Sequence, residues 1–161
     1  MGEHRWYEHE IRVRYQETDQ MGVVYHTNYL NWFELGRTEL IRQLGMRYSD
    51  IESKGCLLPL VEAEVKFHKP ARYDEKIAIY TRIASYTHVR LEFESQIRRI
   101  STAEINQEAD PVPSAVEGTR KPGGELLVSG LTRHVWVNLS WKPVRIDREL
   151  PELFQLLASG G

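Results

Sequence analysis

The sequence contains few residues that could form disulfides or bind a metal ion. Its 161 residues include one cysteine, Cys56, which cannot form a disulfide within the chain. The six histidines show no pair spaced by four residues, the arrangement that binds zinc on one helix face. We therefore predict no metal site, no cofactor and a reducing cytoplasmic location, with Cys56 as a small buried hydrophobic residue.

Long apolar runs and an excess of one charge are also missing. No segment approaches the roughly 18 consecutive apolar residues of a transmembrane helix, and the first ten residues, MGEHRWYEHE, lack the apolar core of a signal peptide. The chain has 21 Lys and Arg residues and 23 Asp and Glu residues, which gives a formal net charge of −2. We therefore predict a soluble protein with no membrane insertion and no nucleic-acid partner, in which a local basic patch holds any anionic ligand.

Alternation of apolar and polar residues predicts strands with one buried face. In residues 7–15, Tyr7, Ile11 and Val13 fall on one face, and the alternate positions carry Glu and Arg. Such a pattern is typical of an antiparallel sheet with one wet side. The further strands are predicted over residues 61–67, 77–83, 89–97 and 125–139.

Helical spacing predicts one long helix and two short ones. Between residues 27 and 44, apolar residues recur every three or four positions, and Gly45 provides a C-terminal stop. We expect this helix to be central and mostly buried. Short helices are predicted over residues 49–54 and over residues 150–157, where Pro151 lies in the first turn.

The chain is predicted to form one domain over residues 1–161, because this length suits a single core. Residues 102–124 hold three of the seven prolines and no aromatic residue, so they are predicted to form a mobile insertion between the last two strands. The elements predict an α+β fold. Periodicity alone leaves two arrangements open, a sheet wrapped around the long helix and an open sheet with helices on one face.

An acidic residue, Asp19, is predicted to lie in a loop just before the long helix. A helix N-terminus offers unpaired N–H groups and partial positive charge, which can polarise a carbonyl group and stabilise an oxyanion. A carboxylate beside that carbonyl could attack it or activate a water molecule. Aspartate in such a loop also caps turns, so the residues alone leave both interpretations open.

Three segments resemble a known family. The run RYQETDQMGVVYHTNYLNWFELGRTE, with KPARYDE at residues 69–75 and WKPVRI at residues 141–146, resembles the 4-hydroxybenzoyl-CoA thioesterase family of the hotdog superfamily, most closely its YbgC-type acyl-CoA thioesterases. The resemblance implies a hotdog fold, in which a five-stranded antiparallel sheet wraps around a long central helix. It also implies a homodimer or homotetramer with active sites between subunits.

The resemblance also implies roles for individual residues. Asp19 corresponds to the catalytic nucleophile or general base, and the backbone N–H at His26 to the group that polarises the thioester carbonyl. The His26 imidazole either orients Asp19 or a water molecule, or bonds the loop at the helix start. Tyr15 either donates a hydrogen bond to the same site or lies in the core with its hydroxyl at the edge.

Residues for binding coenzyme A are carried over by family position. They are Thr87, His88, Arg90 and Arg133, each of which could instead be a solvated sheet residue. The substrate implied is an acyl-CoA, with an acyl carrier protein in place of free CoA also open. Residues 102–124 depart from the family pattern, where the corresponding connection is short.

Three alternatives are weighed against this prediction. Another hotdog branch takes its carboxylate from the central helix, which would here be Glu34 or Glu39. For Glu39 the interpretation as a solvated or ion-paired residue is favoured, and Arg37 could pack against Glu34, so neither displaces Asp19. A hotdog hydratase or dehydratase places histidine five residues after aspartate, whereas His26 comes seven residues after Asp19. A non-catalytic acyl-CoA-binding module would not need the loop acid.

Overall fold

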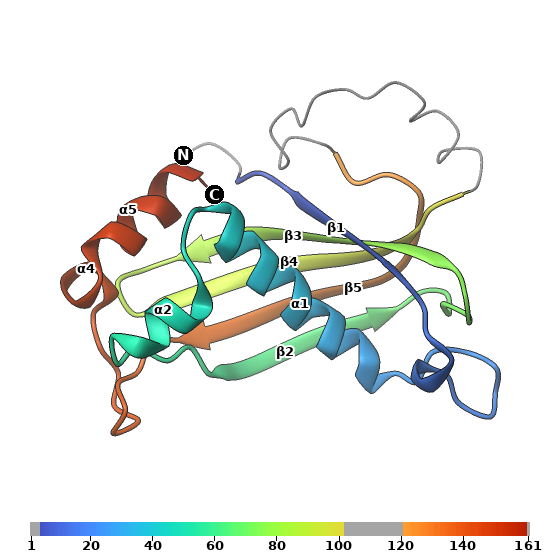
Figure 1. Ribbon diagram of the computed structural model, residues 1–161, viewed down its shortest axis with the longest axis horizontal. Coiled ribbons are helices and arrows are strands. Elements are labelled where there is room, and N and C mark those ends of the chain that lie inside the picture. The colour runs from blue at the N-terminus through green and yellow to red at the C-terminus, as the bar shows by residue number, and fades with distance from the viewer. Residues whose placement is uncertain (1–3, 102–120, 161) are drawn as a thin grey trace.

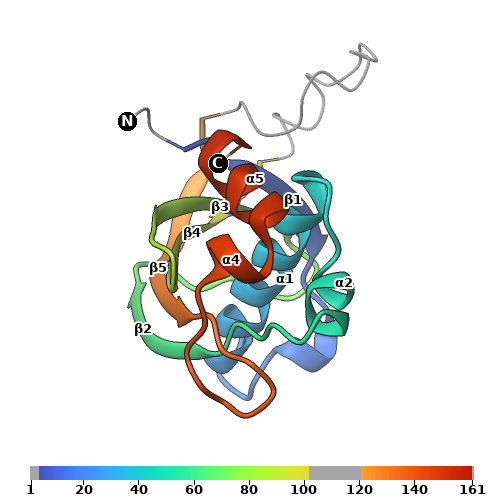
Figure 2. The same cartoon turned by 90° about the vertical axis from the view of Figure 1, so that its left-hand side faces the viewer.

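The fold is a five-stranded antiparallel sheet that curves around a long helix, as predicted (Figures 1 and 2). The computed structural model describes residues 4–101 and 121–160. The strand order is β1-β3-β4-β5-β2, so β1 and β2 are the sheet edges. The strands are β1 (Tyr7–Arg12), β2 (Leu60–Phe67), β3 (Lys76–Tyr86), β4 (Arg90–Arg99) and β5 (Glu125–Val135).

The central helix α1 (Thr27–Gln43) lies in the concave face of the sheet (Figure 2). Most of its apolar residues face the strands, and Phe33 and Leu40 are fully buried, whereas Leu30 is exposed. Gly36 permits close packing on β3, because a Cβ atom there would lie 2.2 Å from Oγ1 of Thr81. The helix therefore rests directly on the middle of the sheet, and its N-terminus is fixed in position.

Shorter helices lie at one end of the sheet, the end opposite the start of α1 (Figure 1). The helix α2 (Tyr48–Ser53) follows α1, and α4 (Ile146–Glu149) and α5 (Pro151–Gly160) lie at the C-terminus, close to the N-terminal end of the chain (Figure 2). Cys56 is buried in the core, as predicted. None of the helices in residues 4–101 and 121–160 combines the length and the hydropathy that crossing a membrane requires.

The first strand is shorter than predicted. It ends at Arg12, and residues 15–17 form a single 3-10 turn, η1 (Tyr15–Glu17). The turn forms because the Glu17 carboxylate accepts the backbone N–H of Arg14, at 2.8 Å. Alternation continues past this point in the sequence, but the local side-chain hydrogen bond replaces the sheet pairing. The last strand likewise ends at Val135 rather than at residue 139.

The strand β2 is exposed on both faces, which corrects the prediction of one buried face. Val61 is 60% exposed and Phe67 is 56% exposed. The strand pairs only with β5, and none of the described residues covers its outer edge. Alternation thus indicated a face that is apolar, but within one subunit that face is not covered.

The predicted insertion at residues 102–124 is described only in part. Residues 102–120 lie outside the described residues. The backbone N–H of Gly123 donates to the Tyr80 hydroxyl at 3.2 Å, and the Gly124 carbonyl accepts from the Arg98 guanidinium at 2.9 Å. The last residues of the segment are therefore held against β3 and β4.

Candidate active site

The loop between η1 and α1 holds Asp19 by backbone hydrogen bonds. The Asp19 N–H donates to the Val23 carbonyl at 2.9 Å, and the Gly22 N–H donates to the Asp19 carbonyl at 3.0 Å. Gly22 has a φ angle of 77°, which a side chain would disfavour. One carboxylate oxygen of Asp19 accepts the N–H of Met21 at 2.9 Å. The turn interpretation and the catalytic interpretation are therefore compatible, because the second oxygen accepts no hydrogen bond from the described residues.

Asp19 lies at the wall of a cleft of about 240 Å³. The cleft is formed where the loop and the start of α1 meet the end of β2 and the segment that follows it. Its lining is mostly apolar and includes two histidines: Asp19, Met21, Val23, Val24, His26, Tyr29, Phe67, His68, Lys69 and Pro70. Segments far apart in the sequence thus meet at this cleft.

The N-terminus of α1 opens beside the same cleft. His26 is the residue that precedes the first helical residue, and within residues 4–101 and 121–160 neither its N–H nor that of Thr27 has a hydrogen-bond acceptor. The His26 ring is exposed and lies edge-on to Phe67, with ring centres 6.5 Å apart. Asp19 and His26, two of the predicted catalytic residues, therefore line one cleft.

Tyr29 anchors the floor of the cleft, a role that the sequence analysis missed. Its buried hydroxyl accepts the N–H of Ala71 at 3.0 Å, and burial raises the pKa of this phenol. Ala71 in turn accepts the N–H of Val24 at 2.9 Å. Tyr29 and Phe67 fell within predicted helix and strand patterns, and only their three-dimensional contacts show that they contribute to the cleft.

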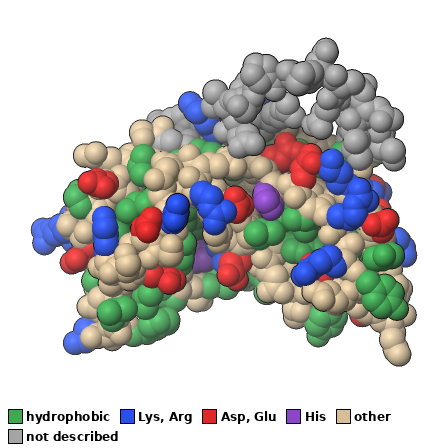
Figure 3. Space-filling view, in the orientation of Figure 1, with side chains coloured by type: hydrophobic (Ala, Val, Ile, Leu, Met, Phe, Trp, Pro, Cys, Tyr) green, Lys and Arg blue, Asp and Glu red, His purple; other side chains and the backbone are tan. Residues whose placement is uncertain are grey.

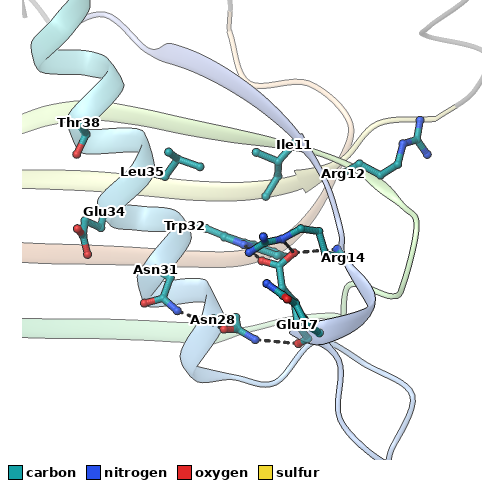
Figure 4. A pocket seen from close by; sticks show the side chains of 11 residues that line it. Ile11, Arg12, Arg14, Glu17, Asn28, Asn31, Trp32, Glu34, Leu35 and Thr38 are labelled. Carbon is teal, nitrogen blue, oxygen red and sulfur yellow. Dashed lines mark hydrogen bonds and ion pairs between the residues drawn. The ribbon is translucent and has the colours of Figure 1, made fainter.

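A second, wider groove of about 810 Å³ lies on the other side of η1, between β1 and α1 (Figure 4). Glu17 lies at its base, only 8% exposed, and its carboxylate accepts the indole N–H of Trp32 at 2.7 Å. The Glu17 carbonyl accepts from the Asn28 side-chain amide at 2.8 Å and from the Tyr25 N–H at 2.9 Å. One residue thus links η1 to the first turns of α1.

Tyr15 does not line the Asp19 cleft. Its side chain is 78% exposed and packs edge-on against Tyr73, with ring centres 5.6 Å apart. The prediction placed it at the end of the first strand, facing the core or the site. Because the strand ends earlier, the ring points outward instead.

The residues predicted to bind CoA lie away from Asp19 within the subunit. Thr87 and His88 are in the β3–β4 turn, at the opposite end of the sheet from the start of α1 (Figure 1). The Thr87 hydroxyl oxygen accepts the N–H of Arg90 at 3.0 Å, and His88 lies 3.6 Å from the Asp147 carboxylate. Arg133, in β5, is paired with three carboxylates of the sheet, those of Glu62, Glu64 and Glu92.

The two glutamates of α1 have different surroundings. Glu39 forms an ion pair with Arg42, one turn further along the helix. Glu34 is exposed, and its charge raises the pKa of Arg37, although burial outweighs this effect and lowers that pKa overall. On the face shown in Figure 3, acidic and basic side chains are interspersed, so that neither sign forms a continuous patch there.

Comparison with known proteins decides the family. A model described as the thioesterase-like superfamily matches residues 13–154. The chain belongs to this family. It is 37% identical over 144 residues to YneP of Bacillus subtilis, and the match covers 89% of this chain and 88% of YneP. It is 30% identical over 103 residues to the acyl-CoA thioester hydrolase YbgC of Escherichia coli, covering 64% of this chain and 75% of YbgC.

Solved structures of the thioesterase-like family agree with the fold. A DHNA-CoA thioesterase from Staphylococcus aureus superposes with a TM-score of 0.79 at 30% identity, over 95% of this chain and 89% of that one. The hotdog fold predicted from the sequence is thereby confirmed, as is the resemblance on which it rested. Membership of the thioesterase-like superfamily places the protein among the thioester hydrolases.

Proposed function

We propose that the protein hydrolyses acyl-CoA thioesters to a free carboxylic acid and CoA, with Asp19 as the nucleophile or general base. The observation that carries the proposal is the cleft beside the open N-terminus of α1, in which one oxygen of Asp19 has no hydrogen-bond donor among residues 4–101 and 121–160. Family membership supports the reaction class, and YbgC and the Staphylococcus aureus enzyme are named for CoA thioesters.

The chemistry follows from the geometry of this cleft. The thioester carbonyl oxygen would accept the N–H of His26, and the helix N-terminus would stabilise the negative charge that develops there. The Asp19 carboxylate would then attack the carbonyl carbon, with the CoA thiolate leaving and water hydrolysing the resulting anhydride. Alternatively, it would take a proton from a water molecule that attacks the same carbon.

The proposed roles of the other predicted residues differ. The His26 imidazole, at the cleft wall, would orient Asp19 or the attacking water. Tyr15 lies outside the cleft, so we assign it no contact with the acyl group within one subunit.

A homo-oligomer is part of the proposal, because β2 is an uncovered edge with exposed apolar side chains. If two copies paired antiparallel along β2, a two-fold axis would place the Thr87 end of one sheet beside the Asp19 end of the other (Figure 1). This arrangement would let Thr87, His88 and Arg90 of one subunit hold the CoA of a substrate whose thioester lies at Asp19 of its neighbour. Arg133 would contribute only after exchanging carboxylate partners.

A panel of short-chain, long-chain and aromatic acyl-CoA substrates, assayed by thiol release, tests the function. We expect hydrolysis of at least one member, and acyl carrier protein thioesters should be included as alternative substrates. Binding without thiol release across the panel would indicate a non-catalytic acyl-CoA-binding module. Water addition to an unsaturated acyl-CoA, without thiol release, would indicate a hydratase.

A further inference from the structure

We propose that Glu17 is a positioning residue that sets the Asp19 loop against α1, an inference that rests on the proposed role of Asp19. Glu17 and Asp19 lie on opposite sides of the same short segment. The Glu17 side chain faces the groove between β1 and α1 (Figure 4), whereas Asp19 faces the cleft at the end of β2. Glu17 is therefore placed to act on the loop without touching substrate.

Each oxygen of the Glu17 carboxylate has its own N–H donor. One accepts the backbone N–H of Arg14 at 2.8 Å, which closes η1, and the other accepts the indole N–H of Trp32 at 2.7 Å, which joins η1 to α1. Trp32 is buried and lies edge-on to Tyr29 in the cleft floor, with ring centres 5.2 Å apart. A continuous set of contacts thus runs from Glu17 to the residue beneath the reacting groups.

The backbone of Glu17 adds to this connection. Its carbonyl accepts from the Asn28 amide and from the Tyr25 N–H, on either side of His26. The loop between Glu17 and Tyr25 is consequently closed at its base, and Asp19 and the N–H of His26 belong to the same closed unit. Reactions of this kind are sensitive to position, and a displacement of about 1 Å can cost on the order of 100-fold in rate.

Glutamine at this position makes a sharp test, because it keeps the size of the side chain. It replaces one acceptor oxygen by an amide group and removes the negative charge that pairs with the Arg14 guanidinium at 3.5 Å. A glutamine side chain has one acceptor oxygen, and its amide group would face a second N–H donor. In Glu17→Gln we expect kcat to fall by about 10- to 100-fold through a shift of the loop. KM should change less than about twofold, since no substrate contact is removed.

The double variant Glu17→Gln/Trp32→Phe separates positioning from general loss of structure. Phenylalanine removes the indole donor, so the glutamine oxygen can bond Arg14 without a donor facing its amide. We expect the double variant to have a higher kcat than Glu17→Gln alone. Glu10→Gln on β1, which removes the ion pair between Glu10 and Lys76 of β3, is the matched control and should keep wild-type kcat.

The measurements are kcat and KM on the acyl-CoA hydrolysed best, with melting temperatures and the indole N–H resonance of Trp32, assigned from Trp32→Phe. A folded Glu17→Gln with more than half of the wild-type kcat would overturn the inference. So would a double variant whose loss in kcat equals the product of the losses in Glu17→Gln and in Trp32→Phe. If Glu17→Gln does not fold, Trp32→Phe alone decides, since it should lower kcat by the same route and full activity would refute the role. Active Asp19→Asn would instead overturn the role of Asp19, and with it this inference, whereas a wild type without thioesterase activity would overturn the proposed function as well.

Discussion

Replacing Asp19 by asparagine separates catalysis from turn formation at the same residue. The oxygen of Asp19 that accepts the Met21 N–H has an equivalent in asparagine, so the turn should persist. The other oxygen, which accepts no hydrogen bond from the described residues, is replaced by an amide nitrogen that can neither attack a thioester nor accept a proton. We expect kcat to fall by at least ~100-fold, the lower end of what a positioned base contributes. This loss corresponds to about 2.7 kcal/mol of transition-state stabilisation.

Alanine at the same position reveals the structural part of the role. It removes the hydrogen bond to Met21 as well, which should lower the free energy of unfolding by about 1 kcal/mol. Asparagine and alanine should therefore be equally inactive but differ in melting temperature by about 2–4 °C. Asp50→Asn, in the first turn of α2, is a control for the charge change and should leave both quantities unchanged.

The assay is thiol release at saturating acyl-CoA, with melting temperatures measured on the same preparations. A stable Asp19→Asn protein that keeps more than a tenth of the wild-type kcat would remove Asp19 from the mechanism. Attention would then move to Glu34, which is exposed on α1, and to Glu39.

Three further predictions concern assembly, the insertion and pH. The protein should remain a dimer or tetramer in light scattering at micromolar concentration, and Val61→Lys on the exposed β2 edge should shift it toward monomer; a monomeric wild type would contradict this. Replacing residues 102–120 by a short turn, with 121–124 retained, should change the melting temperature by less than about 5 °C, and a larger loss would mean that the segment packs on the domain. Burial, followed by the charge of Arg37, lowers the pKa of His134 to about 4. The unfolded chain binds this proton near pH 6.5, whereas the folded protein binds it only near pH 4. The free energy of unfolding should therefore fall by roughly 3 kcal/mol between pH 6.5 and pH 4, and it should fall by less in His134→Gln. An equal pH dependence of stability in both proteins would refute the assignment.

The central helix and the loop that carries Asp19 could be predicted because their signals are local. The helix was expected to run from residue 27 to residue 44 and ends at Gln43, and Asp19 was expected in a loop before it. Apolar spacing and turn-forming residues act within a few positions along the chain, so they are visible in the sequence. The motif around Asp19 also indicated the family to which the chain belongs.

The exposure of β2 and the end of β1 could not be predicted, because both depend on contacts between residues far apart in the sequence. The alternation in β2 shows an apolar face but not whether this subunit covers it, and the strand is in fact exposed. The end of β1 depends on the Glu17 carboxylate, which accepts hydrogen bonds from both Arg14 and Trp32. Glu17 and Trp32 are 15 positions apart in the sequence. The sequence did not indicate a role for Glu17, because no periodic pattern distinguishes this glutamate from the other charged residues.

The peptide of Ala71 has a consequence for how assembly and substrate binding influence each other. Its N–H is bound by Tyr29 of the helix and its carbonyl by Val24 of the loop, so the chain that leaves β2 is fastened to the cleft from both sides. In the proposed oligomer, a subunit that paired along β2 would therefore order the same segment that an acyl group would touch. Association and substrate affinity should then be reciprocally linked, with each strengthening the other by the same factor, and dilution would weaken substrate binding without any change in the cleft residues.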